Sequence, residues 1–374
     1  MKRVLLWTAG IVGLLVLSVG IVIVAGLIDG AVLSLFVWAV AIWRMLRWSA
    51  PKQSKGQRLL WTAGIVGLVG FIVAIAIVHA IQNFELFTPD PRSDVSPAWT
   101  PDGKHIVFSS WFDYRAALYE IDADGQNERQ LTDDGQVVAP AVSPDGRRIA
   151  FTGHRSGYGP DLYVARADGS NAQRLGAHTR LAESAPAWSP DGVRLAFSRH
   201  AVTEYRESEW LFVARADGNG RGLRLVQSDD DSYLEADPSW SANGRFIAYA
   251  GTGGIYVIPS TGGKPRLVAG GLLETPAWAP HTNRIAAVHN DTIRILRLRG
   301  RDRARTIRAF EFSGLYEVGD IAWEPHERKI AFSGYADDLD GGARCLFVLD
   351  LRDGSLTALT DPVPQCLRVA LVRS

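Results

Sequence analysis

The segment APAWSPDGVRLAF, residues Ala185–Phe197, places a Ser-Pro-Asp-Gly turn between two apolar runs. Pro190 presets φ at about −65°, Asp191 suits the bridge region, and Gly192 accepts the left-handed conformation that ends a type I hairpin. The run that follows the turn is rich in apolar and aromatic residues, as strands are. The segment therefore predicts two strands joined by a tight corner.

Five further segments repeat this pattern. The six units begin at Ser96, Ala139, Ala185, Asp237, Thr275 and Asp320. Their aligned Trp or Val residues are separated by 43, 46, 52, 38 and 45 residues, and most units continue with a second pair of strand-like runs. A period near 40–50 residues with four strands per unit is typical of propeller blades. We therefore predict an all-β, six-bladed β-propeller over residues 95–374, with room for a partial seventh blade.

The units W-S-P-D-G, I-A-F, L-Y-V, A-D-G and R-L closely resemble the TolB-like, WD-repeat-like propeller family. They also resemble the propellers of prolyl-oligopeptidase relatives. The resemblance implies the fold, but it says little about function because this repeat serves many functions. Two units depart from it, with His281-Thr282 and His326-Glu327 in place of Asp-Gly. TolB-type proteins are soluble and carry an α/β domain where this chain has apolar stretches, so a role in the Tol system does not follow.

Two long apolar stretches precede the repeats. Val4–Ile28 carries no charge, and Leu59–Ile81 is interrupted only by His79. Each exceeds the roughly 20 residues that a helix needs to cross a bilayer. A shorter stretch, residues 31–43, lies between them. We expect a transmembrane segment at 1–82 with two or three helices, at about 4–28, 31–48 and 59–81, and a linker at 83–94.

Positive charges flank these stretches unevenly. Lys2 and Arg3 precede the first stretch, and five more positive charges lie in the 44–58 loop, whereas the turn after the first stretch carries only Asp29. The positive-inside rule then places the N-terminus and the 44–58 loop in the cytoplasm. Three crossings would put the propeller on the extracytoplasmic side, periplasmic or extracellular, of a bacterial-type cytoplasmic membrane.

The corner aspartates are interpreted as structural. Asp102, Asp145 and Asp191 occupy equivalent corners of different blades, so their carboxylates cannot meet at one ion with ligand distances of about 2–2.6 Å. Units five and six tolerate loss of the carboxylate. Their Thr282 and Glu327 predict different turn types.

Two residue sets on the opposite face, which carries the second-to-third-strand loops, are candidates for binding. The acidic set lies four to six residues before the aligned position and consists of Asp94, Glu183, Glu235, Glu274 and Glu317. At the mouth of the central channel it would favour a cationic ligand, a basic peptide or a metal ion. The alternative is that these acids are solvated loop residues.

The rim set follows the I-A-F aromatic by three residues and consists of Trp111, His154, His200 and Tyr335. Strand-end packing is its alternative.

Three further features receive weaker interpretations. Asp337, Asp338 and Asp340 match a calcium loop only in part. The arginines at 297, 299, 301, 303, 305 and 308 are typical of a solvated edge that resists strand pairing, with anionic lipid headgroups as the alternative. Cys345 and Cys366 should lie on the same face of the last blade, where an oxidising compartment favours a disulfide.

Motifs for catalysis and cofactors do not occur in the sequence. It has no P-loop, dinucleotide fingerprint, zinc-ligand spacing or Gly-x-Ser-x-Gly elbow, so no cofactor or metal is expected. The 40 basic and 40 acidic residues balance, which gives no electrostatic case for nucleic acid. We expect a membrane-anchored extracytoplasmic scaffold, not an enzyme, that binds a protein or envelope component. The alternative is a propeller-only lyase or glycosidase acting on an envelope polysaccharide.

Overall fold

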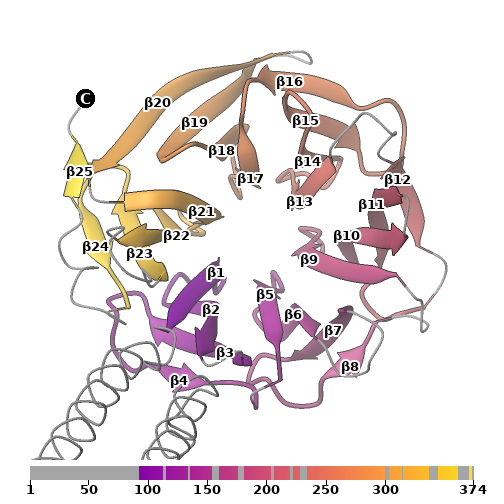
Figure 1. Cartoon of the computed structure of the whole chain (residues 1–374), viewed down its shortest axis with the longest axis horizontal. Coiled ribbons are helices and arrows are strands. Elements are labelled where there is room, and N and C mark those ends of the chain that lie inside the picture. Colours follow the sequence, from indigo (N-terminus) through magenta and orange to yellow (C-terminus); the bar gives the residue numbers. More distant parts are fainter. Residues whose placement is uncertain are drawn as a thin grey trace, which may run out of the picture. The chain divides into compact units, whose positions relative to one another are not determined.

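The repeats form six antiparallel sheets around a central axis (Figure 1). The computed structural model describes residues 92–112, 115–133, 135–153, 160–175, 181–203, 206–219, 222–227, 234–299, 303–313, 315–336, 344–360 and 370–372. The chain divides into two units, Met1–Thr88 and Pro89–Ser374, and the first lies outside the described residues together with the predicted membrane spans. Within the described ranges, no helix has the length and apolar character needed to cross a bilayer.

Each blade is a sheet whose strands follow the sequence order. Blade 1 contains β1 (Ser93–Trp99), β2 (His105–Phe112), β3 (Arg115–Asp122) and β4 (Arg129–Gln130). Blade 2 contains β5 (Val137–Val142), β6 (Arg148–Gly153), β7 (Asp161–Arg166) and β8 (Gln173–Arg174). Blade 3 contains β9 (Ala182–Trp188), β10 (Arg194–Thr203), β11 (Arg206–Arg215) and β12 (Leu223–Gln227).

The second half of the ring repeats this arrangement. Blade 4 contains β13 (Leu234–Trp240), β14 (Phe246–Gly251), β15 (Gly254–Pro259) and β16 (Arg266–Gly270). Blade 5 contains β17 (Glu274–Trp278), β18 (Arg284–His289), β19 (Thr292–Arg299), β20 (Arg303–Ser313) and the C-terminal β25 (Ala370–Val372). Blade 6 contains β21 (Leu315–Trp323), β22 (Lys329–Ala336), β23 (Arg344–Asp350) and β24 (Leu356–Ala358). The predicted six-bladed propeller is confirmed.

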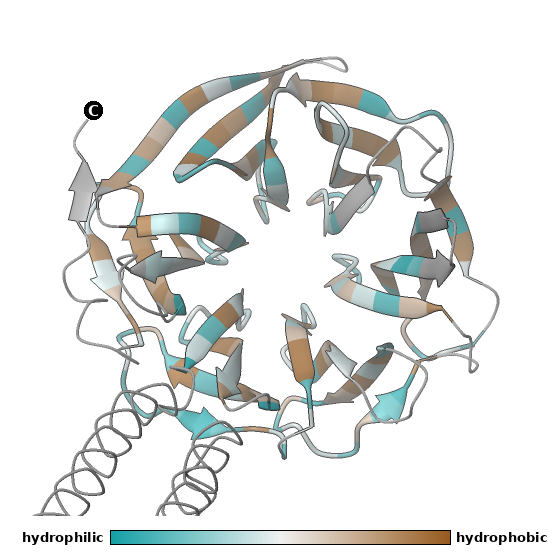
Figure 2. Ribbon diagram, in the orientation of Figure 1, coloured by the Kyte–Doolittle hydropathy of each residue, from teal (hydrophilic) through white to brown (hydrophobic). Residues whose placement is uncertain are grey.

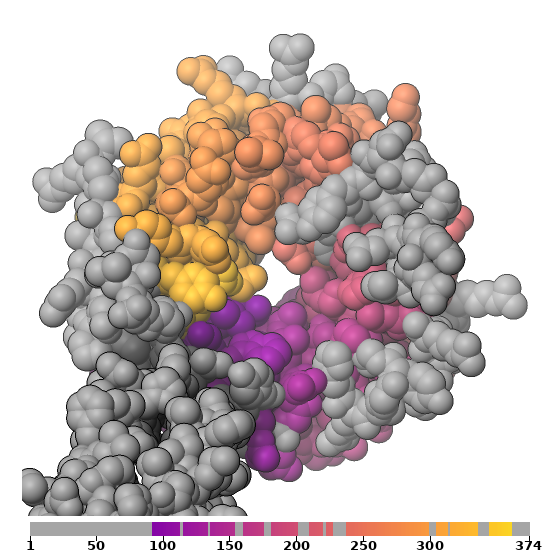
Figure 3. Space-filling view, viewed as in Figure 1, coloured from indigo at the N-terminus to yellow at the C-terminus, as the bar shows by residue number. Residues whose placement is uncertain are grey.

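The first strand of every blade lies beside the central opening, and the fourth lies at the rim (Figure 1). The opening persists when side chains are drawn (Figure 3). Corners between first and second strands lie at one end of the blades, as do the turns between third and fourth strands. We call this end the corner face. The opposite end, the loop face, carries the second-to-third-strand connections and the links between blades.

The core of the ring lies between the blades. Hydrophobic residues are distributed over the strands of all six sheets (Figure 2). They form six buried clusters, each built from two neighbouring blades. In one of them Trp99 and Phe108 of blade 1 pack on Leu346 and Val348 of blade 6. Because no sheet covers its own faces, each blade depends on both neighbours for burial.

Tryptophans of the innermost strands join neighbouring blades through hydrogen bonds as well as packing. Trp188 Nε1 donates to the Ala141 carbonyl of the preceding blade at 2.9 Å, and Trp323 Nε1 donates to Ala277 in the same way. An arginine of the preceding blade stacks on the indole: Arg148 lies 4.5 Å from the Trp188 ring centroid. These tryptophans are therefore buried parts of the inter-blade core.

The ring closes between blades 1 and 6 without an exchanged strand. The Ser96 amide donates to Asp320 Oδ2 at 3.2 Å, and the Arg344 amide donates to Ser93 Oγ at 3.3 Å. The C-terminal strand β25 pairs with β20, so it is the fifth strand of blade 5 and does not begin the partial seventh blade for which the sequence left room.

The corner aspartates hold their own turns. Ser143 Oγ donates to Asp145 Oδ1 at 2.5 Å, the Arg147 amide donates to the same oxygen at 3.1 Å, and Gly146 has a φ of 68°. The Ser143 hydroxyl, followed by the Arg147 amide, lowers the pKa of the Asp145 carboxyl. In blade 4 Asn243 accepts the equivalent bonds from Ser241 and Arg245. The structural interpretation of the corner is confirmed.

The two divergent corners differ from each other. Glu327 takes the place of glycine with a φ of 56°, and its amide donates to the Glu324 carbonyl as the glycines do, so the predicted change of turn type is wrong in blade 6. The strain of a left-handed glutamate is offset by its carboxylate, which accepts bonds from the His281 amide, Thr282 Oγ1 and Arg284 of blade 5. The blade 5 corner forms bends instead of the shared turn, as predicted.

Replacing Trp188 with Phe should lower the free energy of unfolding more than replacing Trp99 with Phe, by about 1–2 kcal/mol. Both indoles are 8% exposed, but Trp99 Nε1 has no hydrogen-bond partner within the described ranges, whereas Trp188 Nε1 bonds Ala141. Denaturant unfolding of the full chain measures the difference. Equal losses would show that the inter-blade bond and the Arg148 stack add nothing to packing.

Replacing Asp145 with Asn should preserve the corner, since Asn243 already serves there, whereas Asp145→Ala should cost about 1 kcal/mol. The lowered pKa means that the ionised carboxylate stabilises the fold at neutral pH. This contribution is lost as the pH falls below about 3.9 through the folded pKa. The advantage of the unaltered chain over Asp145→Asn, measured by thermal unfolding, should therefore shrink on acidification. A difference that stays constant with pH would contradict the linkage.

Candidate functional site

The acidic set does not form an open ring of carboxylates. Asp94 of β1 is fully buried, and Arg92 Nε donates to its Oδ1 at 2.8 Å and to Ser110 Oγ at 2.7 Å. Burial raises the pKa of the Asp94 carboxyl, while Arg92 and Ser110 oppose that rise. This carboxylate holds the first strand in place and is not exposed to a ligand.

Glu183 of β9 has the same arrangement in blade 3. Its side chain is 5% exposed, and Arg199 Nε of the adjacent strand donates to Glu183 Oε1 at 3.0 Å. The Arg199 guanidinium also lies 4.3 Å from the Phe212 ring centroid. The pair is therefore a partly buried strut between β9 and β10.

The remaining acids are spread over three blades. Glu274 at the start of β17 is exposed, and Glu317 of β21 is exposed while pairing with Arg344 at 3.2 Å. Glu235 lies on β13, and its side chain is outside the described part of the structure. Of the five predicted acids, Glu274 and Glu317 are thus the ones seen to reach solvent.

The rim set is distributed around the ring instead of converging. Trp111 at the end of β2 is 37% exposed, and His200 of β10 and Tyr335 of β22 are half-buried. Arg344 stacks 4.6 Å from the Tyr335 ring centroid. His154 lies outside the described residues, as do Asp337, Asp338, Asp340 and Cys366. Cys345 is fully buried at the start of β23, and its pairing with Cys366 stays a prediction.

The loop face carries exposed apolar side chains that the sequence analysis did not single out. Phe112, beside Trp111 at the end of β2, is 54% exposed, and Tyr316 at the start of β21 is 44% exposed. Leu272, in the link between blades 4 and 5, is 71% exposed. Its position could have identified Phe112, because it lies at the end of β2, beyond the run of buried residues.

The innermost strands contain bulges that were not predicted from the sequence. Four residues that precede a proline adopt left-handed φ values of 43–54°: Ser96, Ala139, Ala185 and Thr275. The strand register shifts at each of them. Bulges free the amides to bond the neighbouring blade, as when Ala139 donates to Ser109 Oγ at 3.0 Å. The recurring proline inside a strand was the available signal, since proline within sheets is confined to edges and bulges.

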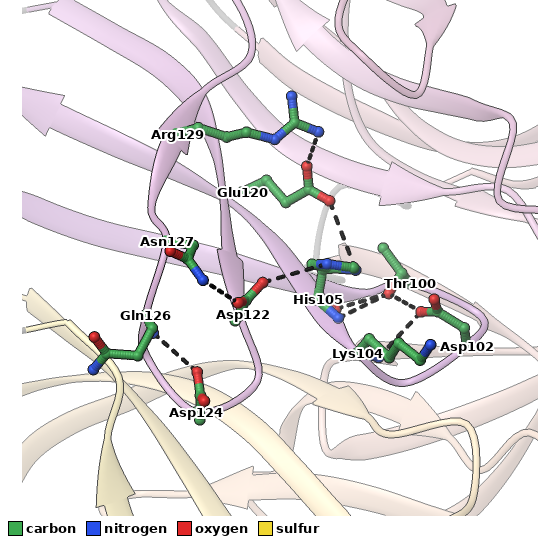
Figure 4. Close-up of polar contacts among 10 residues, drawn as sticks. All are labelled: Thr100, Asp102, Lys104, His105, Glu120, Asp122, Asp124, Gln126, Asn127 and Arg129. Carbon is green, nitrogen blue, oxygen red and sulfur yellow. Dashed lines mark hydrogen bonds and ion pairs between the residues drawn. The ribbon is translucent and has the colours of Figure 1, made fainter.

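The corner face holds the densest polar network described in blade 1 (Figure 4). His105 Nε2 lies 3.3 Å from Asp122 Oδ1, and Arg129 pairs with Glu120 of the neighbouring strand. Carboxylates of β3 therefore lie between His105 of β2 and Arg129 of β4. A cavity of about 250 Å³ lies on the same face between blades 2 and 3, lined by Arg148, Arg166, Arg174 and the Asp217 turn. Arg148 and Arg174 already bond Gly192 and Asp161.

Among the residues that the structure describes, no group of three or more His, Cys, Asp or Glu side chains could hold a metal ion. The site that remains is the loop face, with exposed aromatic side chains and carboxylates joined to arginines.

Comparison with known proteins agrees with the fold. Residues 77–281, more than half of the chain, match the family described as TolB beta propeller domain, and the chain belongs to that family. The match ends at the divergent corner of blade 5. The comparison with curated proteins finds no match.

Solved structures resemble the chain at low identity. TolB from Acinetobacter baumannii is 22% identical, with 70% of this chain and 52% of that chain covered and a TM-score of 0.36. An oligogalacturonate lyase from Vibrio parahaemolyticus is 12% identical, with 72% and 78% covered and a TM-score of 0.49. A nidogen/laminin complex is 14% identical, with 59% and 81% covered and a TM-score of 0.48. These likenesses concern the fold and carry no argument about function.

Replacing Glu183 with Gln should lower the free energy of unfolding by about 2–4 kcal/mol, because the Arg199 guanidinium loses its charge partner in a partly buried site. The same change at the exposed Glu274 should stay within about 0.5 kcal/mol. Denaturant unfolding of the full chain measures both. A negligible effect at Glu183 would show that this pair is not a strut.

Proposed function

We propose that this chain is a membrane-anchored propeller whose ring lies on the extracytoplasmic side and binds a protein or another envelope component through the loop face. One observation carries the proposal. Large apolar side chains are exposed on this face, while Asp94 and Glu183 beside the channel are bound to arginines. Such a surface suits contact with a partner better than general acid–base chemistry, and we include in the proposal that the chain is not an enzyme.

Anchoring is supported by the sequence that precedes the ring. Val4–Ile28 and Leu59–Ile81 are long enough to span a bilayer, and the positive charges between them favour a cytoplasmic 44–58 loop. The chain from residue 82 to the start of β1 is short, so an anchored ring would stay close to the membrane surface. This arrangement would present the propeller to envelope components at a high effective concentration.

The partner surface is proposed at the junction of blades 1 and 6. These blades are neighbours, with β1 packed on β21, β22 and β23. Phe112 and Trp111 extend from blade 1, and Tyr316 extends from blade 6 beside the exposed Glu317. Aromatic side chains of this kind bury large areas at little cost in conformational entropy, and they often dominate binding energy.

Phe112→Ser and Tyr316→Ser should each reduce capture of the partner severalfold, because each removes an exposed aromatic contact. The measurement is cross-linking of the full chain in intact cells with a membrane-impermeant reagent, followed by quantification of the cross-linked species. The matched control is Val193→Ser, since Val193 is 43% exposed on the corner face.

Two outcomes would contradict this proposal separately. Failure of the impermeant reagent to modify the ring, when it does so after lysis, would contradict the extracytoplasmic location. Capture that both aromatic variants leave unchanged, or that Val193→Ser reduces equally, would contradict the loop face as the binding surface.

A further inference from the structure

Blade 5 carries a row of like charges across its three strands β18, β19 and β20. Arg284 of β18 lies directly opposite Arg297 of β19, and Arg297 lies directly opposite Arg305 of β20. Directly opposed residues project from the same face of a sheet, and like charges at such positions are destabilising. The register also opposes Arg299 to Arg303.

The row lacks acidic partners at its outer end. Arg284 is held by Glu327 at 2.5 Å and stacks 5.1 Å from the Trp323 ring centroid. Arg297 and Arg305 are exposed, and within the described ranges neither forms an ion pair or a side-chain hydrogen bond. Two adjacent guanidinium groups are therefore left for a ligand.

The other blades differ at this position. Arginine also opposes arginine in blades 2 and 3, at Arg148–Arg166 and Arg194–Arg215. In blade 1 His105 is directly opposite Asp122, and in a neighbouring row Glu120 is directly opposite Arg129 (Figure 4). His105 occupies the place in its blade that Arg284 occupies in blade 5. In blade 5 the row continues onto the fourth strand at Arg305 and contains no carboxylate.

The strand that carries the outermost arginine is also an open edge. β20 spans Arg303–Ser313, yet β25 pairs with its outer side only at Glu311, Phe312 and Ser313. Among described residues no other strand lies on that side, so the edge from Arg303 to Phe310 offers unpaired backbone groups. Hydrophobic and hydrophilic residues alternate along much of this strand (Figure 2), and Ile307 in its middle is 43% exposed.

We propose that this edge and the Arg297–Arg305 pair bind an extended acidic peptide, which adds to blade 5 as a strand in line with β25. The peptide backbone would pair with β20, and its carboxylates would neutralise the two guanidinium groups. The chain's own β25 shows that this edge accepts an added strand. An anionic lipid headgroup could pair with the two guanidinium groups, but it has no peptide backbone to form hydrogen bonds with the open edge of β20. The inference concerns a surface different from the loop face and does not depend on membrane anchoring.

The test uses the purified full chain in detergent and a fluorescein-labelled peptide of alternating Glu and Val. Binding is followed by fluorescence anisotropy and by hydrogen exchange of the β20 amides. Two matched peptides accompany it: one with Lys in place of Glu, and one with alternate peptide nitrogens methylated, which keeps the charges but blocks strand pairing.

The acidic peptide should bind and slow exchange between Arg303 and Phe310, whereas both matched peptides should bind at least about tenfold more weakly. The double substitution R297Q/R305Q should weaken binding by about tenfold or more. The matched control is R147Q/R245Q, which removes two exposed arginines from other blades and should leave binding unchanged.

Three results would overturn the proposal. One is equal binding of the methylated peptide, which would reduce the site to charge alone. Another is binding that R297Q/R305Q leaves intact. The third is absence of peptide binding while inorganic phosphate or glycerol phosphate still binds the arginines, which would identify a small-anion or headgroup surface. The comparison of peptides on the unaltered chain needs no variant, so a folding defect in R297Q/R305Q would not obscure the result.

Discussion

Burial between neighbouring blades is the constraint on which the whole ring depends. A four-stranded sheet exposes two faces, and here each face is covered only by the next blade, in six shared clusters. The tryptophan of an innermost strand adds direction to this packing, because its indole N–H reaches a carbonyl of the preceding blade. An arginine cation stacked on the indole covers its other side. Packing of this kind fixes the distance and the angle between sheets.

The polar residues of the ring serve the same constraint. The bulged amides of the innermost strands bond the neighbouring blade, and the corner carboxylates organise turns that must recur in the same geometry. In blade 6, which lacks Asp-Gly, Glu324 accepts the local bond from the Arg328 amide, and the Glu327 carboxylate adds bonds to blade 5. Arg92 and Arg199 likewise use acids that could have faced the channel to brace the strands beside it. These charged side chains stabilise the geometry of the ring itself.

Charges left outside this scheme are therefore informative. Arginine opposes arginine at the start of the second strand in blades 2, 3 and 5, but among the described strand pairings the row extends onto a fourth strand, at Arg305, in blade 5 alone. Because the scaffold does not require the difference, a ligand is its natural explanation. The exposed aromatic side chains at the junction of blades 1 and 6 are informative for a similar reason. They lie at strand ends beyond the buried core, so the packing of the ring does not require them.

The amino-acid sequence by itself determined the number of blades and the structural role of the corner aspartates, because turn residues and alternation are local signals that six repeats amplify. It also predicted that the short corners and the longer loops lie on opposite faces, the corner face and the loop face, since strand direction follows from the order of turns. Only the tertiary structure decided which acids remain available. Asp94, Glu183 and Glu274 occupy equivalent positions in the sequence repeat. Asp94 and Glu183 are paired with Arg92, just before β1, and with Arg199 of β10, so their burial and pairing depend on the folded register. The like-charge row of blade 5 became visible in the same way, because Arg284, Arg297 and Arg305 lie on three different strands and become neighbours only through cross-strand pairing.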